Sequence, residues 1–151
     1  MKVINLRLEI GCISFILRKF HDDTYFWDFD IECLMEKKFE CFNPKHYFCS
    51  LNKTDLINLV EYFQTHYLGL IDNQLTESQI FMPLEGDFQI KCMEGEIDNI
   101  DDGYFSISLM FNNGKPYEDA SNCYFGFESV VDIQNIILFC QDIKTLLKLS
   151  S

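Results

Sequence analysis

Four residues of metal-binding types lie close together in the first third of the chain. They are Cys33, Cys41, His46 and Cys49. Thiolate and imidazole ligands of this kind hold tetrahedral zinc. The stretches between them lack the close Cys-x-x-Cys pair that zinc sites usually carry. Cys33 also alternates with the apolar Phe29 and Ile31, as a packing residue would. The sequence therefore predicts packing cysteines, with no metal and no cofactor.

Other patterns that carry chemistry are absent or incomplete. The acidic stretch 98–103 suggests a calcium loop, but Ile100 and Leu109 would occupy positions that need oxygen ligands. The chain has no nucleophile elbow, no phosphate-binding loop and no His-Glu-x-x-His motif. His66 is predicted near the end of a helix, where a histidine that is solvated or paired with the helix dipole is ordinary. We therefore expect a protein that is not an enzyme and has no catalytic residues.

Acidic side chains form two clusters without compensating bases. The clusters are Asp28, Asp30 and Glu32, and then Glu94, Glu96, Asp98, Asp101 and Asp102. Alternation along a strand spaces the carboxylates of the first cluster about 6.5–7 Å apart on its outward face. That spacing resembles successive phosphates of a nucleic-acid strand, so a basic groove could accept the row. Solvated edges that keep sheets from pairing are the other interpretation, and the sequence leaves both open.

The composition of the chain is strongly acidic. The 151 residues carry 24 acids against 12 bases, which gives a net charge of −12. Such a field repels nucleic acid and anionic membranes and attracts basic partners. No stretch approaches the roughly 18 apolar residues of a membrane span. Seven cysteines, an odd number in a chain without a recognisable export signal, indicate a reducing compartment, and we expect the cytoplasm.

One stretch of the chain recurs. Segment 47–64 matches segment 124–141, 77 positions later, without a gap. The identical pairs are Tyr47 and Tyr124, Phe48 and Phe125, Asp55 and Asp132, Asn58 and Asn135, and Gln64 and Gln141. We interpret each copy as the end of a strand, a capping turn and an amphipathic helix.

The first helix is expected from about residue 53 to 67, capped by Asn52 with Asp55 and ended by Gly69. The second is expected to begin at a capping box of Ser129 and Asp132 and to run to about residue 149. Its predicted buried stripe is Ile133, Ile136, Ile137, Cys140, Ile143 and Leu147.

Alternating apolar residues predict strands before each helix. The expected strands are 4–10, 13–20, 25–36 and 39–42 in the first half, and 88–97, 104–111 and 123–127 in the second. Short turns between them favour antiparallel pairing. The sequence thus predicts an α+β protein with antiparallel sheet and two helices. We expect a single domain, 1–151, of two similar strand-strand-strand-helix halves, 1–69 and 80–151.

At both strand-helix junctions the chain resembles the WapI-like immunity proteins of bacterial polymorphic-toxin and contact-dependent inhibition systems. The resemblance is carried by Tyr47 and Phe48 leading into 54–60, by Tyr124 and Phe125 leading into 131–133, and by the order of elements. It implies a small cytoplasmic protein that binds and neutralises a cognate toxin domain. With the charge, it predicts a basic toxin domain held by the two acidic clusters.

Two other functions stay open at this level. An acidic protein of this size could act as a decoy that occupies a nucleic-acid-binding protein. It could also bind a small ligand in the crevice between the two halves. The sequence leaves the oligomeric state and the identity of the toxin open.

Overall fold

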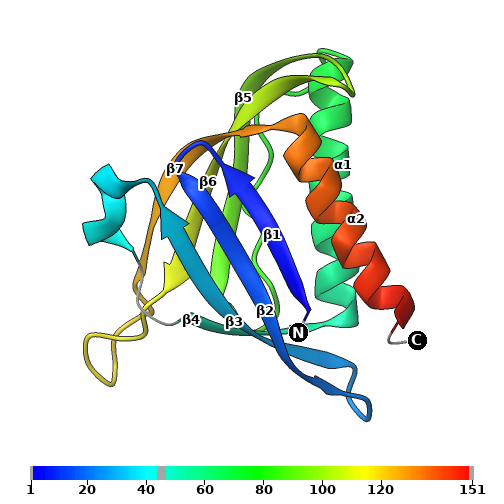
Figure 1. The fold of residues 1–151 in the computed structure, drawn as a ribbon. Coiled ribbons are helices and arrows are strands. Elements are labelled where there is room, and N and C mark those ends of the chain that lie inside the picture. The colour runs from blue at the N-terminus through cyan, green and yellow to red at the C-terminus, as the bar shows by residue number, and fades with distance from the viewer. Residues whose placement is uncertain (1, 44–46, 150–151) are drawn as a thin grey trace.

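The computed structural model describes residues 2–43 and 47–149 as two antiparallel sheets with two long helices (Figure 1). The first sheet has the order β1 (Val3–Leu8), β2 (Gly11–His21), β3 (Phe26–Met35) and β4 (Tyr47–Asn52). The second has the order β5 (Phe88–Asn99), β6 (Asp102–Asn112) and β7 (Tyr124–Asp132). The helices are α1 (Lys53–Ile71) and α2 (Ile133–Leu149), and a short 3-10 helix, η1, covers Lys37–Phe42. The predicted α+β class is confirmed.

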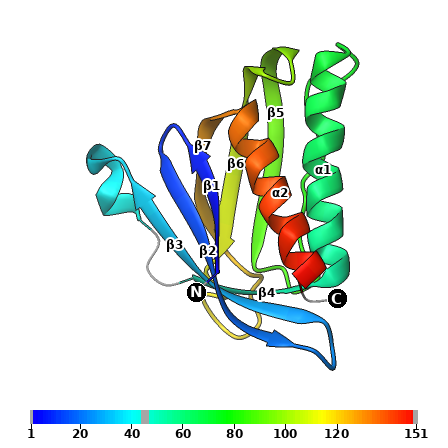
Figure 2. The ribbon, with the colours of Figure 1, turned by 45° about the vertical axis from the view of Figure 1, so that its right-hand side comes forward.

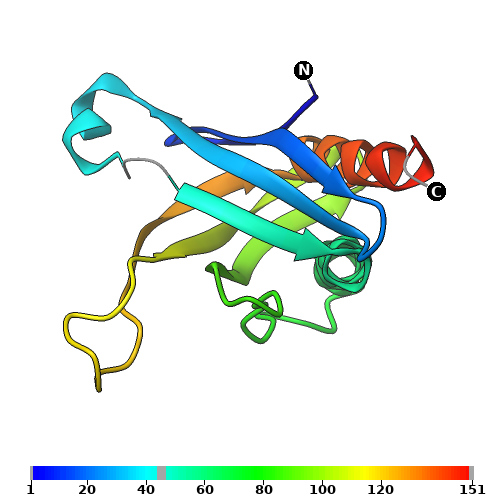
Figure 3. The same ribbon diagram turned by 90° about the horizontal axis from the view of Figure 1, so that it is seen from below.

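Each half of the chain is a meander whose last strand leads directly into a helix. In Figure 2 the two helices lie side by side along one side of the sheets. Viewed from below, in Figure 3, the two sheets lie in layers that face each other, and both helices lie together at the right-hand side of the view. Neighbouring strands run antiparallel, as expected. Short turns join β1 to β2, β2 to β3 and β5 to β6, whereas the longer connections 36–46 and 113–123 join β3 to β4 and β6 to β7.

Aromatic rings from both halves meet in one hydrophobic core. The ring of Phe15 on β2 lies 6.1 Å from that of Phe88 on β5 and 5.8 Å from that of Phe139 on α2. Phe139 in turn lies 5.9 Å from Phe63 on α1, edge to face. The buried residues of the two sheets and two helices form a single cluster. The two halves therefore stabilise each other by sharing apolar surface.

Two contacts join the sheets at opposite ends. At the β1–β2 turn, the Glu9 N–H donates to the Val130 carbonyl at 2.9 Å, and the Ile10 N–H donates to Ser129 Oγ at 3.0 Å. On the other side, Tyr47 of β4 stacks on Phe111 of β6 with 4.6 Å between ring centroids. The sheets are thus attached to each other through strands far apart in sequence.

The predicted start of α1 is confirmed, and its predicted end is wrong. Asn52 Oδ1 accepts the Asp55 N–H at 2.7 Å, and Asp55 Oδ2 accepts the Asn52 N–H at 3.1 Å, which completes a capping box. Gly69 does not end the helix, which continues to Ile71. A Cβ on Gly69 would lie 2.8 Å from that of Leu75, so this glycine allows the following segment to pack close against the helix. The left-handed residue after the helix is Asn73, with φ 55°.

The predicted strand 39–42 is also wrong, because these residues belong to η1. Its turn hydrogen bonds run from the Phe39 N–H to the Glu36 carbonyl and from the Asn43 N–H to the Glu40 carbonyl. Local bonds satisfy the backbone here in place of a neighbouring strand.

At the second junction the strand is longer than predicted. β7 continues to Asp132 and places Ser129 inside the strand, so Ser129 and Asp132 do not form the predicted capping box. Asp132 Oδ1 instead accepts the Gln134 N–H at 2.8 Å. The matched acids of the repeat therefore differ in position, since Asp55 is the third residue of α1 and Asp132 precedes α2.

The face that α2 buries differs in part from the predicted stripe. Ile137 and Leu147 are only half-buried, and Phe139 and Leu146 are buried instead. The other predicted members of the stripe, Ile133, Ile136, Cys140 and Ile143, are buried as expected.

Candidate functional site

The first acidic cluster lies on the outward face of β3, as predicted, but two of its three carboxylates are compensated. Asp30 forms an ion pair with Arg18 of β2. Asp28 contacts His21 Nε2 at 2.6 Å and accepts the Ser50 hydroxyl at 2.7 Å. The expectation of an uncompensated row is therefore wrong for Asp28 and Asp30. Glu32, which is exposed, has no ion pair in the described part of the chain.

Asp28, His21 and Ser50 are the residue types of a catalytic triad, but they are connected in a different order. The carboxylate lies in the centre and contacts both the imidazole and the hydroxyl. A nucleophilic serine needs the histidine itself as its base. Burial opposes ionisation of Asp28, but its hydrogen bonds with His21 and Ser50 and the attraction of His21 and Lys19 outweigh burial and lower its pKa. This arrangement stabilises a negative charge on the sheet surface and does not activate Ser50.

The second acidic cluster lies exposed at the far end of β5 and in the β5–β6 turn. Its members are Glu94, Glu96, Asp98, Asp101 and Asp102. None of the ion pairs between described residues involves these acids. Asp101 Oδ1 receives only a weak amide contact, from Gln134 Nε2 at 3.3 Å. This cluster therefore presents uncompensated charge to solvent.

The structure adds Glu9, Tyr104 and Asp132 to this cluster, which the sequence analysis missed. In the sheet register Glu96 lies beside Tyr104, and Tyr104 lies beside Asp132, so Glu96, Tyr104 and Asp132 form a row across β5, β6 and β7. Tyr104 is 46% exposed. A depression of about 400 Å³ at this end is lined by Asp102, Tyr104 and Asp132, with Glu9 and Arg7 from the neighbouring sheet.

We call this region the hairpin surface. It comprises Glu9, Glu94, Glu96, Asp98, Asp101, Asp102, Tyr104 and Asp132. Alternation with the apolar Phe105 and Ile107 could have placed Tyr104 on the outward face. No sequence signal brings Glu9 there, because its position depends on the contact between the two sheets.

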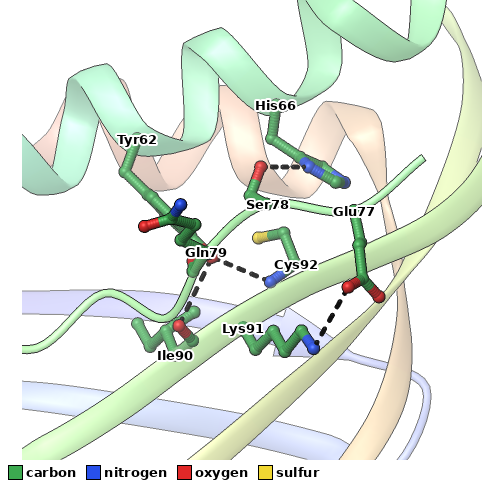
Figure 4. Close-up of polar contacts among 8 residues, drawn as sticks. All are labelled: Tyr62, His66, Glu77, Ser78, Gln79, Ile90, Lys91 and Cys92. Carbon is green, nitrogen blue, oxygen red and sulfur yellow. Dashed lines mark hydrogen bonds and ion pairs between the residues drawn. The ribbon is translucent and has the colours of Figure 1, made fainter. Parts of the chain in front are cut away.

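A second polar cluster joins α1 to the segment 72–87, which connects α1 to β5 (Figure 4). His66 is completely buried, which contradicts the expectation of a solvated side chain. Its Nδ1 lies 2.7 Å from Ser78 Oγ, and its Nε2 lies 2.9 Å from the Met93 carbonyl oxygen. Because a carbonyl only accepts, we assign the proton to Nε2, and Nδ1 then accepts the Ser78 hydroxyl.

A serine hydroxyl bonded to a neutral imidazole is also the arrangement of a nucleophile and its base. Acyl transfer further requires N–H donors directed at the developing oxyanion. The Ser78 N–H is already used, since it donates to the Cys92 carbonyl at 2.9 Å. We therefore assign the pair a structural role, which is to connect α1, segment 72–87 and β5.

Tyr62 supports the same connection. Its hydroxyl donates to the Gln79 carbonyl at 2.7 Å and accepts the Cys92 N–H at 2.9 Å. Burial raises the pKa of Tyr62, so the phenol stays protonated. Phe81 forms an antiparallel bridge with Ile90. Segment 72–87 thus covers the outer edge of β5.

A wide depression lies between α1 and this segment. It has a volume of about 730 Å³ and is lined by Asn58, Glu61, Tyr62 and Thr65 of α1 and by 75 and 77–82. Ile80 and Met82 are exposed beside it. The sequence analysis missed this depression, because nothing in the sequence places the segment against α1.

The buried His66 predicts a specific pH dependence. Burial lowers its pKa below 6.5, and the hydrogen bond with Met93 only partly offsets this. As the pH falls below 6.5, the unfolded chain binds a proton that the folded chain does not, so stability is lost. We expect a loss of at most about 1.4 kcal/mol per pH unit.

Urea unfolding between pH 7.5 and 5.5 measures this loss. Replacing His66 with Gln should remove this part of the slope while lowering stability at every pH. An unchanged slope in the His66→Gln protein would show that other groups cause the dependence.

The cysteines do not form a metal site in the described part of the chain. Burial raises the pKa of the Cys33 thiol to about 12, and that of Cys49 well above its usual value. Buried protonated thiols are poor ligands and poor nucleophiles. Cys41 is exposed on η1, and His46 lies outside the described residues. No group of three His, Cys, Asp or Glu side chains with metal-site geometry occurs among the described residues.

Comparison with known proteins gives no relative from which function could be transferred. No family model matches the chain, and no curated protein matches it. Neither helix within 2–43 and 47–149 is long and apolar enough to span a bilayer.

Proposed function

We propose that this chain is an immunity-type binding protein that neutralises a basic toxin domain through its hairpin surface. The observation that carries the proposal is the gathering of seven carboxylates without ion pairs around one exposed tyrosine, within the described residues. The resemblance at the two strand-helix junctions supports the same function. The internally compensated Asp28 and Asp30 are not included in the proposed surface.

Charge and aromatic surface act on different steps of binding. Clustered like charges steer an oppositely charged partner and raise the association rate by about 10- to 1000-fold at low salt. Tyr104 supplies a large amphipathic side chain of the kind that is enriched at the centre of interfaces. The acids should therefore act mainly on association, and Tyr104 mainly on dissociation.

The test is surface-based binding kinetics against the product of a toxin gene adjacent to the gene of this chain. A Glu94→Gln/Glu96→Gln/Asp98→Asn protein should associate about tenfold more slowly at low salt. Raising the salt from 0.1 to 1 M shortens the screening length from about 10 to about 3 Å and should slow association of the unmodified protein.

The matched control changes net charge by the same amount at a different place. Asp22→Asn/Asp23→Asn/Glu118→Gln neutralises three exposed acids outside the hairpin surface. This control should associate nearly as fast as the unmodified protein. Equal slowing by both triple changes would mean that only the net charge matters, and no slowing by either would overturn the proposal.

Two alternatives have distinct tests. A decoy of a nucleic-acid-binding protein would use the same acids, and would show itself by competing with single-stranded DNA for such a protein. A small-ligand site is favoured by the depression beside α1, whose volume of about 730 Å³ falls within the range of ligand pockets. Ligand binding there would be insensitive to the hairpin-surface changes.

A further inference from the structure

Within the described residues, the outer edge of β7 has no neighbouring strand over its first half. The Val130 carbonyl accepts the Glu9 N–H, so the backbone groups of Val130 point away from β6. Residues two positions apart in a strand share this direction. Gly126 and Glu128 therefore also direct their N–H and C=O groups away from β6. On β6, the Asn112 N–H donates to the Asp87 carbonyl on the side away from β7, which fits the same alternation.

These groups differ from those on the neighbouring edges. The edge of β5 is covered by Ser78 and Phe81, and on β4 the Ser50 N–H donates to Asp87 Oδ2 at 2.9 Å. Within the described ranges, the outward N–H and C=O groups of Gly126 and Glu128 have no hydrogen-bond partner. Two donors and two acceptors are thus available for an added strand.

The surface beside this edge is hollowed and negatively charged. A depression of about 460 Å³ lies there, and its lining includes Phe39 of η1, Glu9, Glu128 and Ser129. No lysine or arginine lines it. Phe125, on the inner face of the strand, is 66% exposed nearby. The edge therefore combines main-chain bonding groups, apolar surface and two carboxylates.

We propose that an extended, basic segment of a partner protein adds to β7 as a further strand at Gly126–Glu128. Main-chain bonds to an exposed edge provide affinity, and alternate side chains provide selectivity. Glu9 and Glu128 select lysine or arginine on the incoming segment. A second copy of this chain is disfavoured as the occupant, because it carries the same net charge of −12.

The position of the edge connects it to the hairpin surface. Glu9 and Val130 line both the depression beside Phe39 and the depression beside Tyr104. A partner held at one site is therefore placed against the other. The inference rests on the proposed function in this respect, because it names how the same partner is held.

The first test uses an eight-residue peptide of alternating lysine and valine as the probe, followed by amide NMR of the full chain. Binding should shift the amide signals of Gly126 and Glu128. Two further peptides carry N-methyl groups on alternate amides, one on the even positions and one on the odd. One of them should bind at least about tenfold more weakly, since it loses main-chain bonds to the edge, and the other should bind like the parent. Equal binding by all three would mean that charge alone holds the peptide and would overturn the proposal.

The second test changes the edge of the protein. Glu128→Gln removes the charge and keeps the N–H, whereas Glu128→Pro removes both. Proline is tolerated at an edge position whose N–H faces outward, and dispersed NMR signals check that the variant is folded. We expect Glu128→Pro to bind the peptide about tenfold more weakly than Glu128→Gln. Equal affinities, or a dimer of the unmodified protein that Glu128→Pro dissociates, would overturn the proposal.

The two proposals can fail separately. In one case the peptide binds at the edge of β7, but the rate of toxin association does not change when Glu94, Glu96 and Asp98 are replaced. That result would support the edge site and overturn the proposed function. In the opposite case, toxin association depends on the charge of the hairpin surface, but Glu128→Pro changes neither the association nor the dissociation rate constant. That result would overturn only the edge site.

Discussion

Replacing Phe139 with Ala is expected to lower the free energy of unfolding by about 3–5 kcal/mol. The side chain is 1% exposed, and its ring lies between Phe15 of β2 and Phe63 of α1. Truncation would leave a cavity where the first sheet and both helices meet. Because rings from several elements surround the site, no single side chain can move in to fill it.

Urea unfolding of the full chain measures this effect, with Leu138→Ala as the matched control. Leu138 is the preceding residue of the same helix and is 54% exposed. Its truncation should change stability by no more than about 0.5 kcal/mol. A loss below about 1.5 kcal/mol for Phe139→Ala would contradict the shared core.

Replacing Gly126 with Ala is the second large effect that we expect, although it adds only one methyl group. A Cβ at this position would lie 1.8 Å from the Leu109 carbonyl oxygen and 2.8 Å from the Met110 Cα atom. Both are backbone atoms of β6, so the strands themselves must separate. The cost should be about 1–3 kcal/mol or more, as for other overpacked sites.

Thermal unfolding with Glu128→Ala as the control tests this expectation. Glu128 lies two residues further along the same strand, and its side chain is exposed. Its replacement should leave the melting temperature nearly unchanged. If Gly126→Ala and Glu128→Ala unfold at the same temperature, β6 and β7 are not held as close together as the contacts require.

The sequence by itself determined the faces of the strands and the start of the first helix. The alternation of Phe105, Ile107, Leu109 and Phe111 predicts one buried face, and all four are completely buried. Successive strand residues point to opposite sides, so this pattern depends on no distant contact. Asn52 and Asp55 form their capping box three residues apart, which is also a local interaction.

Local patterns were insufficient where the chain meets a distant segment. Gly69 was predicted to end a helix because a glycine there suits a left-handed cap, but its role is to admit Leu75. Similarly, Ile137 was predicted to be buried, but α2 packs with Phe139 against Phe15 of β2 and Phe63 of α1. Ile137 is therefore only half-buried.

The candidate site depended most on the tertiary structure. The sequence located both acidic clusters but could not distinguish them, because Arg18 and His21 contact the first only through the register of β2 against β3. The second keeps its charge and gains Glu9 from the other sheet. Whether an acid is compensated, and whether a strand edge is free, depends on which segments lie beside it. Hydrophobic periodicity fixes the face of each residue, but the packing of the two sheets decides its neighbours.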